Sequence, residues 1–156
     1  SALIATLGLA PHPEGGFYRQ IYRSQAMVQA ADGRSPRSAL TTIYFLLPGN
    51  DVSRWHVVQS DEVWHFYEGA PLELFTADAA FTQIDTHVLG EVGHDMVPVY
   101  VVPAGQWQAA RTTGAYTLVG CTVAPGFDFA DFSMLADDAA RAEQVRRTHP
   151  AAAPFI

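Results

Sequence analysis

Residues Trp55 to Gly69 read WHVVQSDEVWHFYEG and hold two of the six histidines and two of the three tryptophans. The segment contains two apolar stretches, Arg54–Gln59 and Glu62–Glu68, separated by a polar Ser-Asp pair. Short stretches rich in Val, Trp, Phe and Tyr, flanked by turn residues, are typical of β-strands. The segment therefore predicts two consecutive strands joined by a tight turn.

The same pattern extends over most of the chain and predicts an all-β fold. Alternating apolar residues, interrupted by Gly, Pro, Asn and Asp, indicate about nine strands. They are Phe17–Arg23, Ala39–Leu47, Arg54–Gln59, Glu62–Glu68, Leu72–Thr76, Phe81–Val88, Pro98–Val102, Gln106–Arg111 and Tyr116–Val123. Short strands at this spacing favour a sandwich or a barrel.

Helices are expected only near the two ends. Residues 2–9 (ALIATLGL) predict a short helix or hydrophobic arm, and residues 137–147 (DDAARAEQVRR) predict a helix whose acidic start and basic end suit its dipole. Residues 148–156, rich in Ala and Pro, predict a loose tail. With 156 residues and no repeat or linker, we expect one domain: an arm at about 1–11, a barrel at about 17–135, and a helix and tail at about 136–156.

Composition excludes several classes of function. The formal net charge is -7 and all nine basic residues are arginine, which excludes Schiff-base lysine chemistry and argues against a nucleic-acid partner. No apolar run approaches the roughly 18 residues that span a bilayer, so no membrane partner is expected. The single cysteine, Cys121, lies mid-strand and predicts a buried, inert thiol; one cysteine favours a cytoplasmic location.

The turn after Gln59 leaves two registers open if the flanking strands form a hairpin. A two-residue loop places His56 opposite His65, so that both histidines share a face. A three-residue loop pairs His56 with Trp64 and places Glu62 on the same face as His56. We favour the second register because an aromatic wall with a few polar groups is typical of ligand sites. His65 is the second candidate for the histidine that faces the interior.

The spacing of these residues resembles the cupin superfamily. Its first motif ends in a Glu and a Gly with six residues between them, as at Glu62 and Gly69, but of the usual two histidines before the Glu only His56 is present. Its second motif is matched by Pro103-Ala104-Gly105, but Gln108 stands where a third histidine is usual. The resemblance therefore implies no tightly bound metal, and a weak divalent site would use His56, Glu62 and Gln108.

Four blocks together look like one small single-domain cupin family of unknown function, commonly filed as predicted sugar epimerases. They read HPEGGFYR at 12–19, SDEVWHFY at 60–67, VPAGQWQA at 102–109 and VAPGF at 123–127. The resemblance runs from about Leu3 to about Leu135. It implies a cupin-type jelly-roll barrel that is usually paired as a homodimer.

Resemblance and residues together predict an enzyme that performs epimerase- or isomerase-like acid–base chemistry on a sugar or nucleotide sugar. His56 or His65 is the expected base, and Glu62 the acid or orienting partner. Further expected ligand-binding residues are Glu14, Arg19 as an anion anchor, Tyr44, Trp64 and Gln108. The alternatives are a non-catalytic small-ligand-binding barrel and a weakly metal-dependent cupin enzyme; apart from that weak metal, no cofactor is expected.

Overall fold

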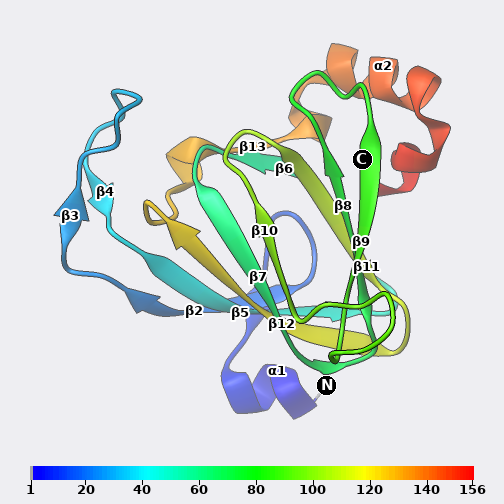
Figure 1. Ribbon diagram of the computed structural model, residues 1–156, viewed down its shortest axis with the longest axis horizontal. Coiled ribbons are helices and arrows are strands. Elements are labelled where there is room, and N and C mark those ends of the chain that lie inside the picture. The colour runs from blue at the N-terminus through cyan, green and yellow to red at the C-terminus, as the bar shows by residue number, and fades with distance from the viewer. Residues whose placement is uncertain (1) are drawn as a thin grey trace.

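Two antiparallel sheets face each other in the computed structural model, which describes residues 2–156 (Figure 1). The six-stranded sheet has the order β1 (Ala10–Pro11), β2 (Phe17–Arg23), β5 (Thr41–Pro48), β12 (Tyr116–Ala124), β7 (Asp61–Gly69) and β10 (Val99–Val102). The five-stranded sheet has the order β13 (Phe132–Met134), β6 (Ser53–Val58), β11 (Trp107–Thr112), β8 (Leu72–Ala77) and β9 (Ile84–Leu89). Because the two sheets share no strand, the jelly roll is an open sandwich rather than a closed barrel.

The predicted β-rich fold is confirmed, with each expected strand present and its ends displaced by a few residues at most. Helices α1 (Ala2–Leu7) and α2 (Ala139–Thr148) lie at the two ends of the chain, as expected. The sequence missed β1 and the separate hairpin of β3 (Met27–Val28) and β4 (Arg37–Ser38), because strands of two residues are too short to show alternation. In the described part of the chain, no helix has the length and apolar character needed to cross a membrane.

The expected hairpin between the two central strands is wrong. Strand β6 pairs with β11 and β13, whereas β7 pairs with β12 and β10 in the other sheet, so the chain crosses the sandwich between Val58 and Asp61. The expected orientation nevertheless holds, because His56 and Glu62 both point into the space between the sheets. The two residues therefore approach from opposite walls rather than from neighbouring strands.

The interior of the sandwich is apolar at one end and hollow at the other. The apolar end consists of Phe45, Leu47, Trp64, Leu72, Leu74, Leu89, Val102, Ala110, Val119 and Cys121. Helix α1 packs on the outer face of the six-stranded sheet through a second cluster that includes Leu9, Leu46 and Leu118. Helix α2 covers the outer face of the five-stranded sheet, on the opposite side of the molecule in Figure 1.

The chain end at 148–156 is not the loose tail that its composition predicts. It forms a 3-10 helix, η3 (Pro150–Phe155), in which Ala152 and Phe155 are buried. The Trp55 indole Nε1 donates a hydrogen bond to the Ala152 carbonyl at 3.2 Å. Burial of the Phe155 ring, together with this bond, offsets the conformational entropy that is lost when a short Ala/Pro segment becomes ordered.

Candidate functional site

A cavity of about 440 Å³ opens between the sheets at the end not filled by the apolar core. Its titratable wall groups are His12, Glu14, His56, Glu62 and Cys121, with Arg23 and Asp128 also among the lining residues. Aromatic rings of Tyr18, Phe127, Phe129 and Phe132 form much of the remaining wall. The volume and the mixture of aromatic and polar groups are typical of small-molecule sites.

The loop at 12–16 carries Glu14 into this cavity. Gly15 has a φ of +110°, and a Cβ there would lie 1.9 Å from the Val52 carbonyl oxygen, so this position requires glycine. The Gly16 amide donates to Asp51 Oδ2 at 2.8 Å, and the Arg54 amide donates to the Glu14 carbonyl at 2.8 Å. These bonds fix the loop against the start of β6, next to His56.

Glu14 and His56 form a buried hydrogen-bonded pair. His56 Nδ1 lies 2.7 Å from the Arg54 carbonyl, which can only accept, so Nδ1 carries a proton. His56 Nε2 lies 3.0 Å from Glu14 Oε2, and the Ser53 hydroxyl donates to Glu14 Oε1 at 3.1 Å. Burial lowers the pKa of His56 to about 4, and burial together with the nearby Glu62 charge raises the pKa of Glu14 well above its usual value. At neutral pH the shared proton therefore resides on Glu14, which donates it to a neutral imidazole.

His12 is a second neutral imidazole at the cavity wall. The Glu14 amide donates to His12 Nδ1 at 3.1 Å, so this nitrogen is the acceptor. Burial, and to a smaller extent the charge of His56, lowers the pKa of His12 to about 4. The Tyr18 ring packs edge-on against His12 with centroids 4.5 Å apart, which orients the imidazole.

Glu62 ends a chain of buried hydrogen bonds that starts at an indole. Trp64 Nε1 donates to Gln108 Oε1 at 2.8 Å, and Gln108 Nε2 donates to Glu62 Oε1 at 2.9 Å. Burial raises the pKa of Glu62 to about 7, although hydrogen bonds with Gln108 and the Cys121 thiol oppose the shift. Glu62 therefore places a carboxyl group with a pKa near neutrality in the cavity wall.

The three residues expected for a weak metal site do not fit a metal ion. An indole N–H can only donate, so Trp64 fixes the Gln108 oxygen toward itself and the amide nitrogen toward Glu62. An amide nitrogen is not a metal donor, and rotating it would leave two buried bonds unmade. His56 Nε2 is engaged by Glu14 in addition. Among residues 2–156 there is also no group of three or more His, Cys, Asp and Glu side chains arranged to hold a metal.

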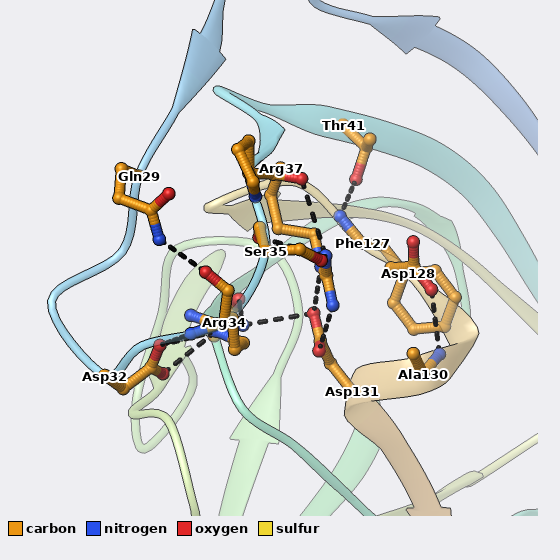
Figure 2. Close-up of polar contacts among 12 residues, drawn as sticks. Gln29, Asp32, Arg34, Ser35, Arg37, Thr41, Phe127, Asp128, Ala130 and Asp131 are labelled. Carbon is orange, nitrogen blue, oxygen red and sulfur yellow. Dashed lines mark hydrogen bonds and ion pairs between the residues drawn. The ribbon is translucent and has the colours of Figure 1, made fainter.

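An aromatic lid, residues 127–132, closes one side of the cavity with Phe127, Phe129 and Phe132. Asp131 anchors this lid to the β3–β4 hairpin, as Figure 2 shows. Arg37 binds both oxygens of Asp131 at 2.9 Å, and Arg34 Nη1 binds Oδ2 at 3.1 Å. The position of the lid therefore depends on the β3–β4 hairpin.

The structure brings only some of the expected site residues together. Glu14, His56 and Glu62 line the cavity, while Trp64 and Gln108 support Glu62 from behind. The other three lie elsewhere: Arg19 donates to the Leu7 carbonyl beside α1, Tyr44 packs in the outer cluster of the six-stranded sheet, and His65 is on the outer face of β7.

His12, which also lines the cavity, was not expected from the sequence as a site residue. The 12–19 block that places Glu14 also contains His12, and it is the sequence signal that could have identified it.

The fold and the cavity define a class: a single jelly-roll sandwich with a small-molecule-sized, polar cavity between its sheets. Residues 1–135 match the family described as Cupin superfamily (DUF985), and the chain belongs to that family.

Two solved structures match nearly the full length of the chain. A hypothetical protein from Leishmania major is 30% identical with a TM-score of 0.85, and a protein from Shewanella oneidensis is 31% identical with a TM-score of 0.86. Each match covers 99% of this chain and 94% of the other.

Oxalate decarboxylase from Bacillus subtilis shares the fold alone, with 14% identity and a TM-score of 0.60 over 88% of this chain and 33% of that enzyme. No curated protein sequence matches the chain.

Proposed function

We propose that this protein is an enzyme that transfers a proton on a small polar substrate of the sugar or nucleotide-sugar class, bound in the cavity between the sheets. The observation that carries the proposal is that Glu62 on β7 and the Glu14–His56 pair beside β6 face one cavity from opposite sheets. Epimerisation next to a carbonyl needs one group to remove a proton and another to return one to the opposite face. Groups on facing walls suit this requirement.

The protonation states support roles that differ from the expectation from sequence, in which a histidine is the base and Glu62 the acid. Glu62, with a pKa of about 7, has a substantial ionised fraction at neutral pH and is the proposed base. Glu14, which is protonated, is the proposed acid that returns a proton to the substrate, and its hydrogen bond to the neutral His56 imidazole positions the carboxyl group. His56 is thus the positioning partner of Glu14.

The wall chemistry supports a sugar-like substrate. Aromatic rings such as Tyr18 and Phe132 can cover the apolar C–H face of a sugar ring, while carboxyl and imidazole groups hydrogen-bond its hydroxyls. Because the described donor set does not fit a metal ion, the proposed proton transfer uses protein side chains alone.

Proton exchange in heavy water tests the proposal. The protein is incubated in D₂O with a panel of monosaccharides, sugar phosphates and nucleotide sugars, and proton NMR follows the loss of a C–H signal. Glu62→Gln and Glu14→Gln should each slow the exchange by about 10²- to 10⁴-fold, the usual contribution of a general acid or base.

His65→Ala is the matched control for His56→Ala, because His65 lies on the outer face of its sheet. Exchange should fall in His56→Ala and stay unchanged in His65→Ala. Loss of exchange in His65→Ala alone would refute the assignment. Binding of a panel member without any exchange would instead identify a non-catalytic binding protein.

A further inference from the structure

Arg23 is the one positively charged side chain among the residues that line the cavity. It reaches the cavity because β2 has an irregular register between Gln20 and Tyr22, which shifts the alternation of the strand. Gln20 and Arg23 therefore both line the cavity, although an odd and an even position would otherwise face opposite sides.

The guanidinium of Arg23 is held in place without a carboxylate partner. Its Nε donates to Gln20 Oε1 at 3.2 Å, and its Nη2 donates to the Phe127 carbonyl of the aromatic lid at 2.9 Å. In the described chain, no Asp or Glu oxygen lies within 4.0 Å of it. Five other arginines do have such a partner: Arg34, Arg37, Arg54, Arg111 and Arg146.

Asp128, the nearby acidic residue of the cavity wall, is engaged elsewhere. Its Oδ1 accepts a hydrogen bond from the Ala130 amide at 2.8 Å and caps the short 3-10 helix η1 (Phe129–Asp131), as drawn in Figure 2. Arg23 is exposed, so its guanidinium lies at the mouth of the cavity. It is oriented by neutral oxygens, and its remaining N–H donors are available to a ligand.

We propose that Arg23 binds an oxyanion group of the substrate, a carboxylate or a phosphate, and so selects acidic sugars over neutral ones. This inference rests on the proposed function and names its substrate class. The planar guanidinium matches both oxyanions with paired N–H donors, and such charge-assisted bonds are about twice as strong as neutral ones. The anion would sit at the mouth, and the reacting carbon would lie deeper, between Glu62 and Glu14.

The size of the cavity narrows the proposed class of substrate further. A volume of about 440 Å³ lies toward the lower end of the range of small-molecule sites, about 300–1,000 Å³. A single sugar ring with an acidic substituent suits a cavity of this size. We therefore favour a sugar acid or a sugar phosphate over a nucleotide sugar.

Calorimetric titration with glucose, glucuronate and glucose 6-phosphate tests the inference, since the three probes differ mainly in their anionic group. The wild-type protein should bind one or both anionic probes at least tenfold more tightly than glucose. Arg23→Gln should abolish that preference without changing the affinity for glucose, and Arg23→Lys should keep part of it. Arg19→Gln, on the outer face, is the matched control and should leave all three affinities unchanged.

Three outcomes would overturn the inference: an equal affinity for all three probes, equal weakening of charged and neutral probes in Arg23→Gln, or no binding of either anionic probe at millimolar concentration. Equal weakening would mean that Arg23 acts only by holding the lid at Phe127. Exchange in D₂O is read separately. Anion selectivity without exchange would refute the proposed function but leave Arg23 as the anion-binding residue. Exchange on neutral sugars that Arg23→Gln does not affect would refute the role of Arg23 alone.

Discussion

The carboxyl group of Glu62 combines deep burial with only neutral hydrogen-bond partners. The residue is 7% exposed, and its described partners are the Gln108 amide and the Cys121 thiol. Neither partner compensates a full negative charge in a low-dielectric site, so ionisation of Glu62 costs free energy in the folded protein. The same burial that raises the pKa of Glu62 toward neutrality therefore makes the protein less stable at alkaline pH.

Replacement of Glu62 by Gln should remove this pH dependence. The folded-state pKa of about 7 lies above the ordinary value of 4.5, so the stabilisation from the bound proton is complete below pH 4.5 and is lost as the pH rises through 7. Between pH 4.5 and pH 8, the free energy of unfolding of the wild type should fall by about 3 kcal/mol relative to Glu62→Gln. Urea denaturation across this range measures the difference. Exposed Glu91→Gln is the control and should follow the wild type; parallel curves for wild type and Glu62→Gln would contradict the prediction.

Motif spacing identified His56 and Glu62, but it could not locate the cationic residue of the cavity. Arg19, the expected anion anchor, and Arg23 lie on one strand, and simple alternation cannot reveal the irregular register between Gln20 and Tyr22. That irregularity turns Arg23 inward, while Arg19 remains on the outer face beside α1. The role of Gln108 was also hidden, because the bond from Trp64 that fixes its amide comes from the opposite sheet.

At the level of elements, the aromatic lid and the β3–β4 hairpin depend on one another. Neither has a regular strand partner in the core of the sandwich beyond the pairing of β13 with β6, and two arginines of the hairpin meet on the single carboxylate of Asp131. The Arg37 guanidinium lowers the pKa of Asp131, so this carboxylate stays ionised across the physiological range. Access to the cavity is therefore tied to a charged contact between two short elements.

Asp131→Asn should release the lid. Removing one partner of a nearly buried ion pair costs about 3 kcal/mol, here mostly as local opening because the lid lies outside the apolar core. Cys121 lines the cavity and is the single thiol of the chain, so its rate of modification by a small thiol reagent reports the opening. We expect a rate at least tenfold higher in Asp131→Asn. Arg111→Gln, which breaks an exposed pair with Glu73, should not change the rate, and an unchanged rate in Asp131→Asn would contradict the anchoring role.

The order of strands was harder to predict than the strands themselves. Local alternation and turn residues identify each strand from its own sequence, and this is why the nine longer strands were found. Sheet membership depends on pairs distant in the chain, such as Gly120 with His65 and Gln108 with His56, which local patterns do not encode. The prediction of a loose tail at 148–156 was wrong for a similar reason, because Phe155 packs against Trp55, about a hundred residues away in the chain.

At the scale of the whole molecule, the two outer faces of the sandwich differ. Helices α2 and η3 cover the outer face of the five-stranded sheet, whereas α1 covers only one end of the outer face of the six-stranded sheet. The uncovered part carries Tyr67, Val99 and Val101, which are 49%, 44% and 47% exposed. Strand β10 is also the last strand of its sheet, so its backbone groups on one side lack a strand partner there.

We therefore predict that two copies associate through this outer face, as the family resemblance also implies. An exposed apolar sheet face and an unpaired edge are the features that association of two identical chains can bury around a two-fold axis. Sedimentation of the wild type at micromolar concentration should give twice the 17.0 kDa mass of the chain. The double variant Val99→Lys/Val101→Lys places four like charges at such an interface and should sediment as the monomer. Val92→Lys is the matched control, because Val92 is 83% exposed in a loop outside the strands, and this variant should remain dimeric. A wild-type species of 17.0 kDa would refute the dimer, and a dimer that survives the double substitution would place its interface on another face.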